Sequence, residues 1–119
     1  MFINFTNHPS EKWSAEQLAD AAKYGEIMDI PFPTVDVYLT KPQIQKMAAQ
    51  YADDIAKLSP AAVLCQGEMT LTYAVVSLLK AKGITVLCAC TEREVTQLLT
   101  VGGDTVKKSV FTFACFREY

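Results

Sequence analysis

His8 is the side chain of this sequence best suited to acid–base chemistry. It is the only histidine of the chain, and it lies in the polar stretch Thr6–Ser10 together with Asn7. Because the ordinary pKa of imidazole is close to neutrality, His8 can act as a general acid or base, or donate a hydrogen bond to phosphate. The alternative is that His8 caps a turn and packs beside Pro9.

A second polar stretch is Gln66-Gly67-Glu68-Met69-Thr70. Gly67 allows a backbone to approach a ligand closely, and Thr70 can cap a helix whose free N–H groups bind anions. Glu68 would repel an anion, so it fits better as a base, as a partner for Arg93, or as an acceptor for ribose or amine groups. The alternative is a strand-to-helix turn with an exposed Glu68. The stretch has neither the glycine spacing of a dinucleotide site nor a Walker motif.

A third polar stretch is Thr91-Glu92-Arg93. Arg93 can make a charge-assisted contact with phosphate, or it can pair at the surface with Glu92 or Glu94. The sequence has no nucleophile elbow and no Ser-His-Asp order.

The surrounding sequence predicts alternating strands and helices. Apolar runs bounded by loops predict the strands Met1–Thr6, Glu26–Ile30, Ala61–Cys65 and Ile84–Cys90. Capping boxes and apolar residues at helical spacing predict three helices. These helices begin at Ala15 and end at Gly25, run from Thr40 to about Leu58, and cover Leu71–Lys82.

The pattern changes after residue 90. Val95–Val101 contains branched residues, Gly102-Gly103-Asp104 is a hairpin turn signal, and Thr105–Phe116 is rich in Val, Phe and Thr. We therefore expect a C-terminal antiparallel β-hairpin. The alternative is a short helix over residues 94–100, before the turn.

These elements predict one α/β domain over residues 1–119. It is a Rossmann-like three-layer domain, with a mostly parallel sheet, three main helices and the C-terminal hairpin. Ligands of such sheets bind beyond the carboxyl ends of the strands, where the strand order reverses. We expect the first and third strands to be neighbours at that point, so the first two polar stretches would share one crevice.

Composition excludes several classes of protein. The chain has 119 residues, 50% hydrophobic and 20% charged, with a net charge of −2. This is globular composition, and it argues against a broad basic surface for long nucleic acid. We see no signal peptide and no apolar run near the roughly 20 residues that span a bilayer. We expect a cytoplasmic protein without membrane contact.

The four cysteines do not predict a metal site. None of them forms a C-x-x-C pair, and His8 is distant from all of them in sequence. Each lies in a predicted buried strand, so we interpret them as reduced core residues. They are Cys65, Cys88, Cys90 and Cys115. We expect no metal and no cofactor.

The segment Asn4-Phe5-Thr6-Asn7-His8-Pro9-Ser10 resembles the end of the first strand in small CRISPR-associated accessory proteins, the group that includes CARF-like ring nucleases. The short Rossmann-like layout is also similar. CARF domains often carry a Gly- and Thr-rich turn with a Lys before a later helix. Here Gln66–Thr70 takes that place, and the second Gly and the Lys are missing.

This resemblance implies a homodimer that binds a cyclic oligoadenylate and can cleave it without metal. In that chemistry a ribose 2′-hydroxyl attacks the adjacent phosphate, and the protein holds the attack in line. By position, His8 would be the acid or base, and Asn7, Ser10 and Thr70 would position phosphate or ribose. Two alternatives remain: a non-catalytic nucleotide sensor or sponge, and a protein-interaction module that uses the hairpin Val95–Phe116.

Overall fold

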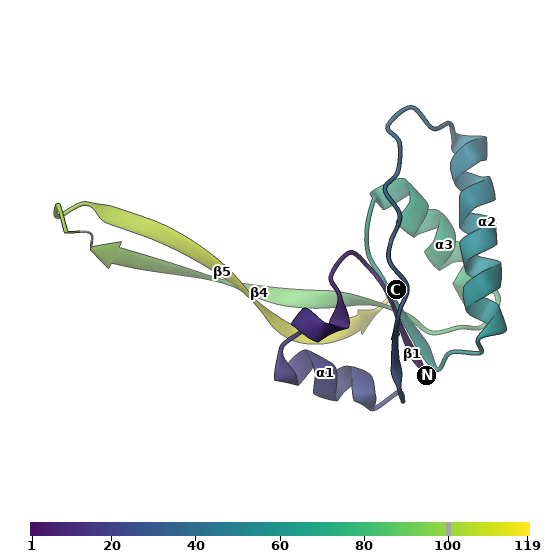
Figure 1. The fold of residues 1–119 in the computed structure, drawn as a ribbon, viewed down its shortest axis with the longest axis horizontal. Helices are drawn as coiled ribbons and strands as arrows, with labels where there is room; N and C mark the ends of the chain where they lie inside the picture. The colour runs from purple at the N-terminus through teal and green to yellow at the C-terminus, as the bar shows by residue number, and fades with distance from the viewer. Residues whose placement is uncertain (100) are drawn as a thin grey trace.

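Strands and helices alternate along the chain in the computed structural model, which describes residues 1–99 and 101–119 (Figure 1). The strands are β1 (Phe2–Phe5), β2 (Ile27–Asp29), β3 (Ala62–Cys65), β4 (Val86–Leu99) and β5 (Thr105–Glu118). The helices are a short 3-10 turn η1 (Ser10–Lys12), α1 (Ala15–Ala22), α2 (Lys41–Lys57) and α3 (Met69–Ala81).

The described strands form a five-stranded sheet in the order β2-β1-β3-β4-β5. Neighbouring strands from β2 to β4 run parallel, and β5 is antiparallel to β4. The predicted α/β fold, with a mostly parallel sheet and a C-terminal hairpin, is confirmed. The strand order reverses between β1 and β3, so their carboxyl ends mark the point where such sheets bind ligands.

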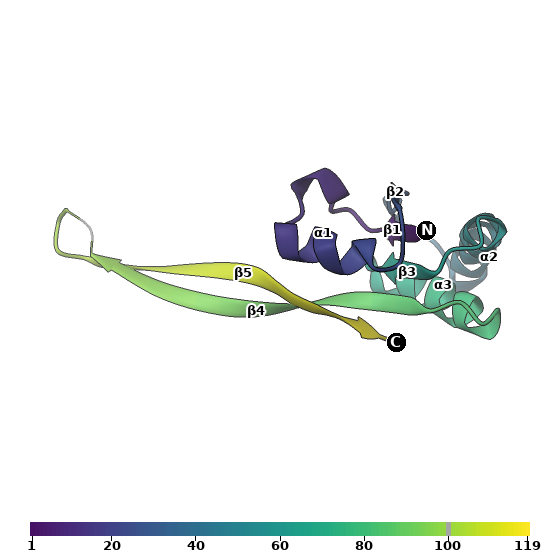
Figure 2. The same cartoon turned by 90° about the horizontal axis from the view of Figure 1, so that it is seen from below.

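Two apolar clusters cover the two faces of the sheet. Between the sheet and α2–α3 lie Ile3, Phe5, Val63, Ile55 and Leu79. On the opposite face, under α1, lie Phe2, Trp13, Ala21, Leu64, Leu87 and the half-buried Phe116. Every residue of β1 and β3 is buried, as expected for parallel strands covered on both faces. Figure 2 shows the resulting three layers edge-on.

The predicted capping residues are confirmed for two of the three helices. Ser14 accepts the Gln17 N–H before α1, and Thr40 forms a complete capping box with Gln43 before α2. The third start is different. Glu68 caps α3, so the helix begins at Met69 and the predicted start at Leu71 and the capping role of Thr70 are wrong.

The predicted end of the fourth strand at Cys90 is also wrong. β4 continues to Leu99 because β5 pairs with it along its whole length, from Leu87↔Glu118 to Leu99↔Thr105, with one β-bulge between Cys90 and Thr91. The alternative helix is therefore wrong for residues 94–99, and residue 100 lies outside the described part of the chain. Thr91, Glu92 and Arg93 lie in this strand, so the predicted third loop does not form.

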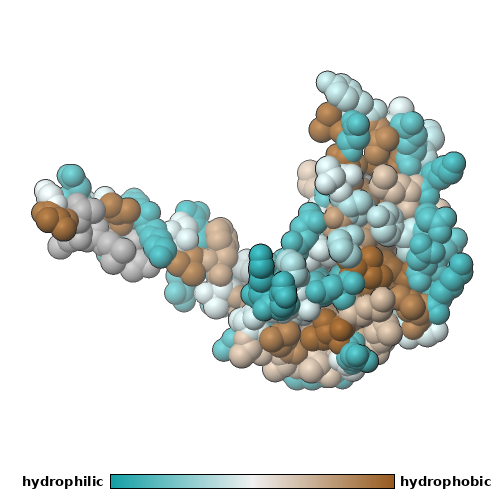
Figure 3. All heavy atoms as spheres, viewed as in Figure 1, coloured by the Kyte–Doolittle hydropathy of each residue, from teal (hydrophilic) through white to brown (hydrophobic). Residues whose placement is uncertain are grey.

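Beyond the body of the domain, the hairpin continues as an arm, which we define as residues 91–99 and 105–113. β4 pairs with β3 at Val86 and Leu87, and further along its pairing partner is β5. The arm stands out from the body in Figures 1, 2 and 3. The Cα radius of gyration is accordingly 17.3 Å, against about 13.5 Å for a compact chain of this length.

The cysteines are free thiols in different environments. Cys65 is buried, Cys88 and Cys90 are half-buried, and Cys115 is exposed. The prediction of core residues therefore holds fully for Cys65 and is wrong for Cys115. Burial raises the pKa of the Cys65 thiol to about 12. Among the described residues, no helix combines the length and the apolar character needed to cross a membrane.

Candidate functional site

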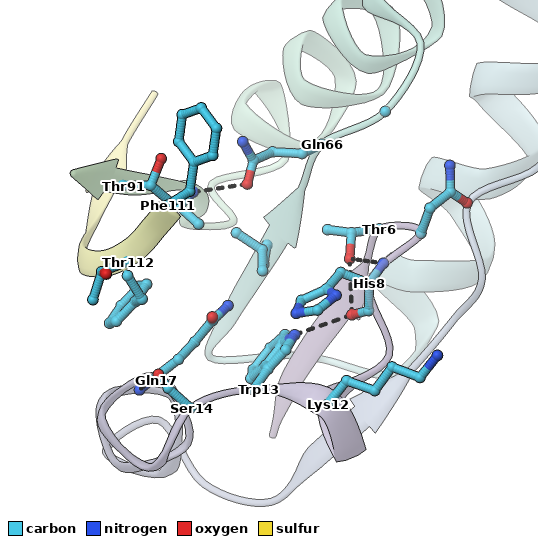
Figure 4. Close-up of a pocket in the computed structure, with 15 residues that line it drawn as sticks. Thr6, His8, Lys12, Trp13, Ser14, Gln17, Gln66, Thr91, Phe111 and Thr112 are labelled. Carbon is cyan, nitrogen blue, oxygen red and sulfur yellow. Dashed lines mark hydrogen bonds between the residues drawn. The ribbon is translucent and has the colours of Figure 1, made fainter. Parts of the chain in front are cut away.

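A crevice of about 730 Å³ lies at the carboxyl ends of β1 and β3. Figure 4 shows hairpin residues such as Thr91 and Phe111 on one side, and His8, Trp13 and Lys12 on the other. Polar and apolar side chains both line it, and nine of the fifteen lining residues are polar. The polar lining residues are Thr6, Asn7, His8, Lys12, Ser14, Gln17, Gln66, Thr91 and Thr112.

A buried asparagine on β1 holds the loop that carries His8. Asn4 is 1% exposed, and its Nδ2 donates to the His8 carbonyl oxygen at 2.9 Å and to Asp29 Oδ1 at 3.0 Å. Its Oδ1 accepts the Thr6 hydroxyl at 2.7 Å. A buried amide with these partners satisfies its polar atoms without water. The loop backbone is therefore fixed to the sheet.

Ser10 anchors the same loop from outside the crevice. Its N–H and its hydroxyl both donate to Asp29 Oδ2 at 3.1 Å. Asp29 lies opposite Asn4 in the register of β1 and β2. Ser10 therefore joins the loop to β2, and it does not line the crevice.

Trp13 forms a wall of the crevice and also belongs to the core. Its indole packs edge-on against Phe2, with 6.1 Å between ring centroids, and its Nε1 donates to the His8 carbonyl oxygen at 3.0 Å. That carbonyl thus accepts from both Asn4 and Trp13, while the His8 residue is exposed. The backbone of His8 is held while its imidazole borders the opening.

Gln66 and Gly67 bring the loop after β3 to the crevice. Gln66 Oε1 accepts the Ala89 N–H at 2.9 Å, which ties the end of β3 to β4. Gly67 lies against the buried ring of Phe32, and a Cβ at this position would lie 2.4 Å from two ring atoms. The structure thus gives Gly67 a packing role, in addition to its place in the lining.

The carboxylate of Glu68 is engaged at the start of α3. It accepts the Leu71 N–H at 2.8 Å and the Thr70 N–H at 3.0 Å, and the Thr70 hydroxyl also donates to it. These hydrogen bonds, the Leu71 N–H first, lower the pKa of Glu68 below its ordinary value. Neither Glu68 nor Thr70 lines the crevice.

Arg93 lies on the arm and also does not line the crevice. Its guanidinium donates to the Ser109 hydroxyl across the hairpin, at 2.9 and 3.2 Å. The predicted contact of Arg93 with Glu68 is not among the ion pairs of the described residues.

The structure therefore brings together four of the eight predicted site residues, from the first and second polar stretches: Asn7, His8, Gln66 and Gly67. It places Ser10, Glu68, Thr70 and Arg93 elsewhere. Further lining residues come from the segment from η1 to α1 and from the hairpin, and these are Lys12, Trp13, Ser14, Gln17, Thr91, Phe111, Thr112 and Phe113. The structural role of Asn4 could have been suspected from the sequence, because Asn4 is the one amide inside the apolar run from Met1 to Phe5. No local pattern marked residues 111–113 as part of a site, because their place depends on the path of β4 and β5.

The lining combines a cation, hydroxyls, amides and an exposed aromatic ring. Lys12 supplies a positive charge, and hydroxyls and amides surround the opening. Among the described lining residues none is a carboxylate, so an anion meets no like charge there. Phe111 adds an aromatic ring that is 67% exposed. No group of three metal-ligating side chains occurs in the described part of the chain.

A family model matches residues 1–117. The chain belongs to the Uncharacterized protein MJ1673 family. The matched segment includes the residues of both the crevice and the arm. No curated protein and no solved structure matches the chain.

Proposed function

We propose that the crevice binds a nucleotide of the cyclic oligoadenylate class, and that the protein is a CRISPR-associated accessory protein of the ring nuclease type. One observation supports this most. Asn7 and His8 meet Gln66 and Gly67 at the point where the strand order reverses, beside an exposed aromatic ring. The resemblance of Asn4–Ser10 to such proteins supplies the ligand class.

In this proposal each kind of lining group has a partner on the ligand. Lys12 and the imidazole of His8 contact a phosphate, because both donate hydrogen bonds and Lys12 carries charge. Gln17 and Gln66 supply amides for ribose or base edges. Phe111 stacks on a base, which is a sequence-tolerant contact. The ligand thus bridges α1, the loop after β3 and the hairpin.

Cleavage in this proposal needs neither metal nor cofactor. A ribose 2′-oxygen attacks the adjacent phosphorus, a new O2′–P bond forms, and the bond from phosphorus to the 5′-oxygen breaks. His8 takes the proton from the 2′-hydroxyl and returns it to the departing 5′-oxygen. The products are a 2′,3′-cyclic phosphate and a 5′-hydroxyl. We leave Glu68 out of this step because its carboxylate caps α3.

The test is incubation of the purified protein with cyclic tri-, tetra- and hexa-adenylate in a chelator, followed by chromatography. We expect at least one ring to bind and to open. His8→Ala should lower turnover about 100-fold and weaken binding by less than about tenfold, because Lys12 still contacts the phosphate. Glu68→Gln is the matched control, and it should leave turnover unchanged. If none of the three rings binds or opens, the proposal is wrong.

A second candidate is a non-catalytic sensor or sponge with the same crevice. The placement of Glu68 favours it, because His8 is then the only one of the two predicted acid–base groups that lines the crevice. A ring that binds and is recovered intact, with His8→Ala without effect on its fate, would identify this function.

The proposal also covers location and assembly. We propose a cytoplasmic homodimer. Free thiols at four positions suit the reducing cytoplasm, and a two-fold pair is the commonest assembly of a small chain. Sedimentation at several protein concentrations tests the assembly.

A further inference from the structure

The two faces of the arm differ in charge. In an antiparallel pair, directly opposed residues share a face, and the faces alternate along each strand. Arg93 opposes Phe111, and Gln97 opposes Lys107, so both cations lie on the same face as Phe111. The carboxylates of Glu92 and Glu94 lie on the other face.

The face with the cations continues into the crevice. Thr91, Phe111 and Phe113 of this face line the crevice, and Thr91 and Phe113 are opposed in the hairpin register. We call this surface the crevice-side face. From the other face, Thr112, which opposes Glu92, also lines the crevice. The other face carries Lys108 and Val110 together with the two carboxylates, since Lys108 opposes Thr96 and Val110 opposes Glu94. The crevice and the crevice-side face of the arm therefore both favour an anionic ligand.

Arg93 is oriented along this face. Two of its N–H groups donate to the Ser109 hydroxyl at 2.9 and 3.2 Å, which leaves three of the five guanidinium donors for other acceptors. A guanidinium held in this way loses less freedom when it binds a phosphate. Ser109 lies on the same face, because it opposes Val95.

Aromatic packing fixes the end of the crevice-side face that lies nearest the body of the domain. Phe113 packs on Phe116 with 4.9 Å between ring centroids, and Phe116 packs on Phe2 at 5.3 Å. Phe113 is thereby joined to the core, while Phe111, two residues further along the arm, is 67% exposed. A large exposed ring beside cations is the combination with which proteins stack the bases of single strands.

We propose that the crevice-side face of the arm binds a single-stranded oligonucleotide, which runs from the crevice along the hairpin. The bases stack on Phe111, and Arg93 and Lys107 contact the phosphates. This rests on the proposed function for the nucleotide that occupies the crevice, and extends the ligand class to strands longer than that nucleotide. The overall charge of −2 does not oppose it, because Glu92 and Glu94 lie on the other face of the arm.

The test is fluorescence anisotropy with labelled linear oligoadenylates of two and eight nucleotides. We expect the octamer to bind at least tenfold more tightly than the dimer. Phe111→Ala should weaken octamer binding about tenfold, and Phe111→Trp should restore it. Arg93→Ala should weaken octamer binding and reduce its salt dependence by about one ion. Dinucleotide binding should not respond to Arg93→Ala.

Val110→Ala and Glu94→Gln, on the opposite face, are the matched controls and should leave octamer binding unchanged. Equal binding of the two probes, or equal losses in Val110→Ala and Phe111→Ala, would overturn the proposal. So would dissociation of a dimer by Phe111→Ala, because the face would then belong to a second copy. Failure of the cyclic rings to bind, with octamer binding still dependent on Phe111, would remove the proposed ring chemistry and leave the arm as a binding surface.

Discussion

The loops after β1 and β3 leave neighbouring parallel strands at the same edge of the sheet, yet they use their polar residues differently. After β1, the backbone is held by the buried Asn4, and the His8 side chain is directed to the opening. After β3, the carboxylate of Glu68 turns back to cap α3, and Gln66 binds the backbone of Ala89. The first loop thus leaves the His8 side chain at the crevice, while the Glu68 carboxylate of the second loop is occupied by the start of α3.

This difference shows that a polar residue at a ligand-binding edge must be judged by its partners. The sequence makes both Glu68 and His8 candidates for acid–base chemistry. A carboxylate one residue before a helix has free N–H groups within reach, whereas His8 precedes only the short turn η1. The availability of backbone donors therefore decides which of the two remains open to a ligand.

The largest loss of stability should come from Asn4→Ala, which removes the side chain that holds the first loop to the sheet. The substitution leaves the partners of a buried amide without their hydrogen bonds, which should cost about 3 kcal/mol of unfolding free energy. Urea unfolding measures this cost. Asn7→Ala, in the exposed part of the same loop, is the control and should change stability little. Equal stability of Asn4→Ala and the wild type would show that the network does not hold the loop.

Gly67→Ala should have the next largest effect, in the second loop. The added Cβ would lie 2.4 Å from the Phe32 ring, which is buried, so the ring must move. Overpacking of this kind should cost about 1–3 kcal/mol. Phe32→Leu combined with Gly67→Ala should recover part of the loss, and the absence of recovery would contradict a steric cause. Urea unfolding of the single and double variants measures both values.

Tyr119→Phe tests the attachment of the end of β3, directly before the second loop, to the residue that follows β5. The Tyr119 hydroxyl donates to the Cys65 carbonyl oxygen at 2.8 Å, and its removal should cost about 1 kcal/mol. Burial raises the pKa of Tyr119 to about 12. The contribution should therefore be complete below the unfolded pKa near 10 and decline as the pH rises toward 12. A constant difference between the two proteins across that range would contradict this assignment.

The smallest effect should come from Glu68→Gln, and it should depend on pH. The cap lowers the folded-state pKa of Glu68, so its contribution is present above the unfolded pKa of about 4.3 and is lost as the pH falls through the folded value. The variant should therefore lose less stability than the wild type on acidification. Thermal melts from pH 7 to pH 3 measure this, and parallel curves for the two proteins would refute it.

The order of the elements was predictable because each carries a local signal. The capping residues Ser14 and Thr40 and the apolar runs of β1 and β3 act over a few residues. The convergence of Asn7 and His8 with Gln66 and Gly67 followed from topology alone, since crossovers of this kind have few solutions. Half of the predicted site was therefore within reach of sequence reasoning.

The rest depended on contacts that no local pattern encodes. The apolar run to Cys90 gave no sign that β4 continues to Leu99, because pairing with β5 extends it. Glu68 replaced Thr70 as the cap because the helix begins at Met69, and the carboxylate oxygens of Glu68 accept the N–H groups of Thr70 and Leu71. The part that the hairpin plays in the crevice follows from that pairing and was invisible from sequence.

The contact of Phe116 with Phe2 and Trp13 has a consequence for the synthesis of the protein. The ring that completes the α1 layer belongs to residue 116 of 119, so it is synthesised after all the other elements that pack against it. A nascent chain can form β1, α2, β3 and α3 earlier, but the α1 side of its sheet stays uncovered until then. The rings of Phe2 and Trp13 therefore lack one of their aromatic neighbours on the unfinished chain, and they gain it once Phe116 is in place.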